Sequence, residues 1–78
     1  GVLIRGETSH FELIAAQVAR GLASAAEQSG VPVAFGVLAA ETVEQVLERT
    51  GGGQGNRGWE AALAAIEAAN VMKRLEAP

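Results

Sequence analysis

The chain has a single histidine, His10, in the segment RGETSHFE. A short apolar run precedes it, then Gly6 and the hydroxyl residues Thr8 and Ser9, which open an apolar-periodic helix. Backbone N–H groups at such a helix start lack intrahelical partners and carry the positive end of the dipole, which suits a phosphate. A histidine there can exchange a proton near neutral pH. The spacing fits a phosphate turn beside a proton-transfer group, but also an ordinary capped turn with a solvated histidine.

Other stretches carry weaker chemical signals. The glycine-rich GGGQGNRG lacks the Lys-Ser/Thr ending of a P-loop and does not follow a strand, so a flexible connector explains it equally well. Arg49 follows Glu48, an ordinary surface pair unless the arginine faces an anion. With one histidine and no cysteine, a closed zinc site would need carboxylates, so no metal site is predicted.

Apolar patterning places a buried strand in GVLIR and a helix after it. Thr8 or Ser9 is the expected N-cap, and Glu12 stands three residues after Ser9 as in a capping box. Gly30 is the expected C-terminal glycine of this helix.

The second half of the pattern begins with VPVAFGVL, predicted as a strand covered on both faces. A short helix over ETVEQVLERTG should stop at Gly51, GGGQGN should be a loop, and RGWEAALAAIEAANVMKRLEAP should form a long helix. The order strand, helix, strand, helix, helix predicts an α/β arrangement with parallel strands and a right-handed crossover. Two such strands cannot form a stable sheet alone, so this is an incomplete layer.

Composition limits the classes of function and partner. The 78 residues carry a formal charge of −3 and show no basic stripe, which argues against nucleic acid as a partner. The apolar runs are too short to cross a membrane, and no signal peptide is visible. The lack of cysteine is compatible with the cytoplasm. A chain this small buries only about 60% of its unfolded surface, so association with other chains is expected.

Four stretches together, GVLIRGETSHFE, GVPVAFGVL, ETVEQVLERTG and GNRGWEAALAAIEAAN, closely resemble the C-terminal half of lumazine synthases. The R-G-x-T-x-H turn and the G-N-[KR]-G-x-E-A-A run are the specific motifs. The resemblance implies a flavodoxin-like parallel sheet flanked by helices, of which residues 1–78 supply the last two strands and three helices. The N-terminal half of that single domain would then lie upstream, as another chain or an unseen segment. The chain also opens on Gly1 directly at a strand, which favours this interpretation.

The resemblance further implies a transferase of riboflavin biosynthesis. Such enzymes condense a ribitylaminouracil with dihydroxybutanone phosphate, giving dimethyl-ribityllumazine, phosphate and water, without metal or organic cofactor. They form homo-oligomers, as pentamers, paired pentamers or icosahedral capsids, with active sites between neighbouring subunits.

By the same resemblance, the site residues take distinct roles. His10 transfers protons. Glu7, Thr8, Ser9 and Arg49 hold the substrate phosphate. The uracil side is bound largely through the backbone of Val2, Leu3 and Ile4, and Phe35 reaches into a neighbouring subunit's site.

Two departures from the family pattern concern the second motif. Arg57 stands where lysine is usual, followed by Glu60, and TGGGQGN replaces the common AGTKAGN. Arginine does not easily lose its proton, so an electrostatic role for Arg57 survives better than a proton relay.

Two alternatives remain open at the level of sequence. The chain fits an engineered, split or permuted self-assembling shell subunit built on the same fold, and its abrupt start favours that interpretation. It also fits a generic phosphate-binding α/β fragment. Retention of His10 and Arg49 favours the enzyme.

Overall fold

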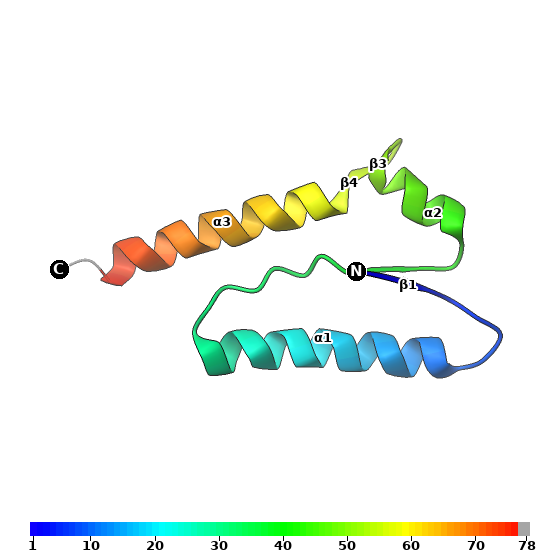
Figure 1. Cartoon of the computed structure of the whole chain (residues 1–78), viewed down its shortest axis with the longest axis horizontal. Helices are drawn as coiled ribbons and strands as arrows, with labels where there is room; N and C mark the ends of the chain where they lie inside the picture. The colour runs from blue at the N-terminus through cyan, green and yellow to red at the C-terminus, as the bar shows by residue number, and fades with distance from the viewer. Residues whose placement is uncertain (77–78) are drawn as a thin grey trace.

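The structure is a computed structural model and describes residues 1–76. Two 20-residue helices run along its length, with short strands and a short helix at one end (Figure 1). The elements in order are β1 (Val2–Ile4), α1 (His10–Ser29), β2 (Leu38–Ala40), α2 (Val43–Glu48), β3 (Thr50–Gly52), β4 (Gly55–Asn56) and α3 (Arg57–Glu76).

The strands β1 and β2 pair in parallel, as the strand–helix–strand pattern predicts. Val2 lies opposite Leu38 and Ile4 opposite Ala40. The Arg5 N–H extends the ladder by donating to the Ala40 carbonyl at 2.9 Å. The mixed α/β class and the parallel pairing are therefore confirmed.

The second strand is shorter than the sequence indicates. The predicted strand VPVAFGVL covers residues 31–38, of which only Leu38 lies in β2, so the prediction was wrong over residues 31–37. The ladder ends where the Gly1 amino group donates to the Gly36 carbonyl at 3.0 Å. Residues 31–35 lie beyond that point and run between α1 and α3 without a strand partner in the described part of the chain (Figure 1).

The N-terminal end of α1 is capped differently from the prediction, whereas its C-terminal end is capped as predicted. The predicted capping box is wrong, because the Ser9 side chain makes no capping hydrogen bond and the Glu12 carboxylate pairs with Arg5 instead. At the other end, Gly30 adopts a left-handed conformation with φ of 70° and donates its N–H to the Ala26 carbonyl at 3.0 Å. This is the expected glycine C-cap.

The segment after α2 is a small hairpin rather than the predicted loop. α2 already ends at Glu48, before Gly51, and β3 pairs with β4 in antiparallel orientation. The Arg57 N–H donates to the Arg49 carbonyl at 2.8 Å, which closes the hairpin. The Asn56 side chain then caps α3 by accepting from the Trp59 N–H at 3.0 Å.

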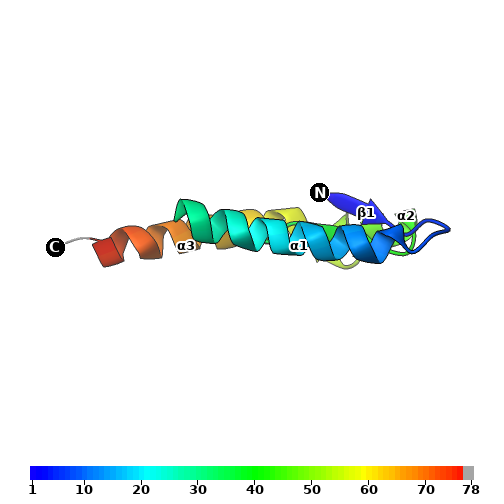
Figure 2. The ribbon, with the colours of Figure 1, turned by 90° about the horizontal axis from the view of Figure 1, so that it is seen from below.

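The chain forms one thin layer with almost no core of its own. Its extents are 53 × 28 × 10 Å, and Figure 2 shows the helices and strands lying in a single plane. The radius of gyration is 15.0 Å, whereas a compact domain of this length has about 11.5 Å. The accessible area is 5790 Å², against about 4,500 Å² for a compact protein of this mass.

The hydrophobic side chains buried in the described residues are only Ala40 and Val46. Large apolar residues such as Leu13, Trp59 and Ile66 are each about 60% or more exposed on the two long helices. The two long helices therefore leave large apolar side chains in contact with water. None of the helices in residues 1–76 is long and apolar enough to cross a membrane.

Candidate functional site

The predicted site residues begin at the carboxyl edge of the two parallel strands. Ile4 and Ala40 are paired, so the segments after them leave the sheet at the same edge. The chain then turns through residues 5–9 and enters α1 at His10. The structure thus keeps the strand predicted to bind the uracil ring, the turn predicted to bind phosphate and His10 in one continuous strand–turn–helix unit.

The predicted phosphate turn, residues 7–9, is open to solvent. Glu7, Thr8 and Ser9 are all exposed, as is His10 at the first position of α1. Its N–H donates to the Thr8 hydroxyl oxygen over a long 3.4 Å, and Ser9 provides no side-chain cap. The first turn of α1 therefore lacks a side-chain acceptor from Ser9.

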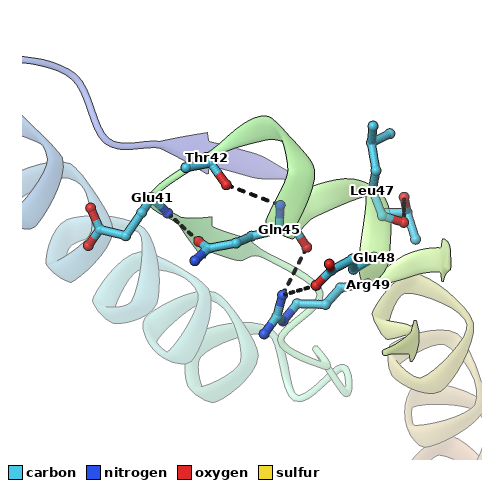
Figure 3. Close-up of polar contacts among 7 residues, drawn as sticks. Glu41, Thr42, Gln45, Leu47, Glu48 and Arg49 are labelled. Atoms are coloured by element: carbon cyan, nitrogen blue, oxygen red, sulfur yellow. Dashed lines mark hydrogen bonds and ion pairs between the residues drawn. The ribbon is translucent and has the colours of Figure 1, made fainter. Parts of the chain in front are cut away.

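Arg49 follows the last residue of α2, and its side chain contacts other residues of that helix. Its Nη1 donates to the Gln45 carbonyl at 3.0 Å and lies 3.7 Å from a Glu48 carboxylate oxygen (Figure 3). The side chain is 35% exposed. Within residues 1–76 no hydrogen bond or ion pair joins it to residues 7–10. The structure does not bring Arg49 into contact with the phosphate turn in a single chain.

The hairpin places Arg57 beside the backbone of Arg49. The Arg57 guanidinium contacts both carboxylate oxygens of Glu60, at 2.9 and 3.3 Å. The predicted secondary residues are therefore a pair on the first turn of α3, with the arginine charge already balanced by its neighbour.

The apolar residues assigned to ring binding are accessible. Val2 and Ile4 are 50% and 42% exposed, and Leu3 is half-buried. Phe35, in the extended segment before β2, is 56% exposed. Such an exposed aromatic ring is available to a ligand or to another polypeptide.

Sequence analysis missed the best-connected side chain of this edge, Arg5. Its guanidinium pairs with Glu12 on α1 and, through Nε at 2.7 Å, with Glu41 after β2. It also lies over the Phe11 ring, 4.7 Å from the centroid. The signal was the strand register, because pairing Ile4 with Ala40 brings Arg5 and Glu41 side by side.

The Arg5 pairing affects the protonation of Glu12. The Arg5 hydrogen bond holds the pKa of the Glu12 carboxyl below its usual value, and the two carboxylates raise the pKa of Arg5. Because the Glu12 pKa is lowered on folding, the pair is fully present above the ordinary carboxylate pKa. It is lost as pH falls through the lowered value. At neutral pH Arg5 and Glu12 are therefore both charged. Among residues 1–76, no three side chains gather in a way that would hold a metal ion.

Comparison with known proteins gives two concordant matches. The family model of 6,7-dimethyl-8-ribityllumazine synthase matches residues 1–73. The curated 6,7-dimethyl-8-ribityllumazine synthase of Chloroherpeton thalassium is 53% identical over 75 residues, which cover 96% of this chain and 48% of the relative. The chain thus spans about half the length of that relative.

Proposed function

Because the chain belongs to the 6,7-dimethyl-8-ribityllumazine synthase family, we propose that it works as part of a lumazine synthase. In that role it condenses a ribitylaminouracil with dihydroxybutanone phosphate. The product is dimethyl-ribityllumazine, and one phosphate and two waters leave. The observation that carries the proposal is the strand–turn–helix unit of residues 2–10, in which an exposed helix start stands directly beside the chain's histidine.

The chemistry of this unit suits the condensation. The turn of Glu7, Thr8 and Ser9 binds the phosphate at the start of α1 and so fixes the leaving group. His10 then exchanges protons with the substrate as phosphate and water depart. The backbone of β1 and the side chains of Val2, Leu3 and Ile4 form the uracil side, with Phe35 contributed from a neighbouring subunit. Positioning two substrates in this way supplies much of the acceleration, and no cofactor is required.

In this proposal the N-terminal half of the fold comes from another chain or from a further segment of the same polypeptide. Large apolar side chains of β1, α1, α2 and α3 are exposed, and the chain spans about half of its relative. We infer a flavodoxin-like sheet in which β1 and β2 are the last two strands, and a homo-oligomer with its sites between subunits. A pentamer or an icosahedral capsid built from pentamers, acting in the cytoplasm, fits this arrangement. The alternative of a shell subunit used only as a scaffold has no supporting observation.

The complete assembly is the oligomer formed by the polypeptide that contains these residues, or by the Chloroherpeton relative with this chain in place of the segment it matches. An identity of 53% makes that exchange conservative.

Arg49 is the second phosphate ligand in this proposal. Its ion pair with Glu48 is long, at 3.7 Å, and both side chains are more than a third exposed, so little opposes exchanging Glu48 for a phosphate. Because Arg49 does not contact the phosphate turn within one chain, we infer that Arg49 of one subunit meets the phosphate turn of a neighbouring subunit. Arg57, paired with the Glu60 carboxylate, keeps its proton, so its role in this proposal is electrostatic and it takes no part in the proton transfers.

Arg49→Ala in the complete assembly is expected to weaken binding of inorganic phosphate and of the phosphorylated substrate by about 2 kcal/mol, as for a lost charge-assisted hydrogen bond. The ribitylaminouracil should bind nearly as before. Titration calorimetry with each ligand measures the difference. Arg20→Ala, which removes an exposed arginine well along α1, is the matched control and should change neither affinity. Equal losses for both ligands in Arg49→Ala would exclude the phosphate role.

The hairpin that carries Arg49 and Arg57 should depend on one glycine. A Cβ at Gly52 would stand 2.8 Å from the Glu48 Cα and from the Leu47 carbonyl oxygen, whereas one at Gly53 would meet nothing within 4 Å. Gly52→Ala should therefore destabilise the complete assembly by about 1–3 kcal/mol, as overpacking does. Gly53→Ala should stay within about 0.5 kcal/mol of the parent. The thermal unfolding midpoints of the two variants and the parent measure the difference in stability. Equal midpoints for Gly52→Ala and Gly53→Ala would contradict the close approach of Gly52 to α2.

A further inference from the structure

Arg5 occupies the junction between the parallel strands and the start of α1. Its backbone N–H donates to the Ala40 carbonyl at 2.9 Å, so its Cα is fixed to the end of β2. Its side chain leaves this point with the guanidinium directed at two carboxylates, Glu12 and Glu41. One belongs to the first turn of α1 and the other follows β2. A single side chain therefore joins three elements around the turn of residues 6–9.

The planar guanidinium is suited to this double contact. Nη1 faces Glu12 while Nε reaches Glu41 at 2.7 Å, and the Phe11 ring lies against the cation at 4.7 Å. Lysine has one point charge and cannot serve two carboxylates and an aromatic face at once. The contacts also extend along α2. The Glu41 N–H donates to the Gln45 side chain at 2.7 Å, and the Gln45 carbonyl accepts from Arg49 (Figure 3).

The charges at this edge would oppose a phosphate without Arg5. Glu12 lies two residues after His10, and Glu41 leaves the sheet at the same edge as the phosphate turn. Two unbalanced carboxylates so close to a bound dianion would repel it. Arg5 balances both while holding the first turn of α1 against the sheet. These ion pairs are one-third or more exposed, so their contribution to overall stability is small.

We propose that Arg5 is a positioning residue for phosphate binding: by bridging Glu12 and Glu41 it fixes the turn of residues 6–9 and removes the negative potential that would weaken the phosphate site. This inference rests on the proposed function, since it concerns the same turn. Arg5 itself does not touch the substrate. Its effect is transmitted through the orientation of α1 and the neutralised carboxylates.

The test uses the complete assembly and inorganic phosphate as the probe. Arg5→Gln should weaken phosphate binding roughly tenfold, while ribitylaminouracil binding and the thermal midpoint change little. The triple variant Arg5→Gln, Glu12→Gln, Glu41→Gln should recover part of the lost affinity, because the repelling carboxylates are gone while the bridge that fixes the turn is still missing. A purely structural role for Arg5 would not give this recovery. Arg20→Ala again serves as the control.

Phosphate binding by Arg5→Gln within twofold of the parent overturns the inference. So does a triple variant as weak as the single one. If Arg5→Gln does not assemble, Arg5→Lys decides, because it keeps a charge but not the bridge: a threefold or greater loss supports the inference and parental affinity contradicts it. The proposed function is judged separately by Thr8→Ala. If the parent binds phosphate and Thr8→Ala weakens it, the phosphate turn stands whatever Arg5 does. If the parent binds no phosphate, both fail.

Discussion

Residues 1–78 in isolation are expected to show no cooperative thermal unfolding as a monomer. The described chain buries only Ala40 and Val46 among its hydrophobic side chains, and its 10 Å thickness leaves both faces of the layer in water. Two three-residue strands cannot offset the conformational entropy of ordering the chain. The free energy of folding should therefore be unfavourable until other polypeptide covers α1, α3 and the sheet.

Circular dichroism during heating, combined with light scattering for the mass, checks this expectation. The isolated chain should be unfolded, aggregated or associated, with a broad change of signal. The complete assembly, measured alongside, should melt cooperatively. A monomeric isolated chain with a sharp transition above ~50 °C, within the range of ordinary mesophilic domains, would contradict the conclusion that the layer depends on partners.

Replacing His10 should have the largest effect on catalysis. A positioned acid–base group commonly contributes 10²–10⁴-fold, so His10→Ala in the complete assembly should lower kcat by on the order of 10²-fold where proton transfer limits turnover. The decrease in kcat is smaller, down to a few-fold, if positioning of the substrates supplies most of the acceleration. Phosphate affinity should be retained, because the turn binds through residues 7–9.

The pH profile separates a chemical role from a structural one. If His10 exchanges protons with the substrate, its loss should remove one limb of the dependence of kcat on pH. His10→Gln is the matched variant, since it keeps a polar side chain at the helix start but cannot titrate. Unchanged rate and unchanged pH dependence in both variants, with assembly and phosphate affinity intact, would show that His10 is a solvated first-turn residue.

Local signals predicted the parts of the fold that local interactions determine. The β1 run, the glycine end of α1 at Gly30 and the parallel pairing all follow from hydrophobic period and chain order. The errors lie where tertiary partners decide. Residues 31–35 are as apolar as a strand but lie beyond the end of β1, and Ser9 with Glu12 reads as a capping box only if Arg5 is ignored.

The candidate site divides in the same way. Residues 7–10 are adjacent in sequence, so their grouping needed no structure. Arg5 became visible only through the register that opposes Ile4 to Ala40. The approach of Arg49 to Arg57 depends on a hairpin whose glycines gave no strand signal. Phe35 and Arg49 are proposed to act in sites shared between subunits. Contacts of that kind leave no pattern in the sequence of one chain, so the sequence could not predict where these side chains lie.

The most direct test of the proposed function is turnover by the complete assembly. Ribitylaminouracil and dihydroxybutanone phosphate are mixed with the assembly, and formation of dimethyl-ribityllumazine is followed together with release of inorganic phosphate. The unmodified Chloroherpeton relative serves as the reference. The proposal predicts product and phosphate in a one-to-one ratio, at a rate well above that of the mixture without protein. An assembly that forms and melts like the reference yet gives no more product than the uncatalysed mixture would contradict it.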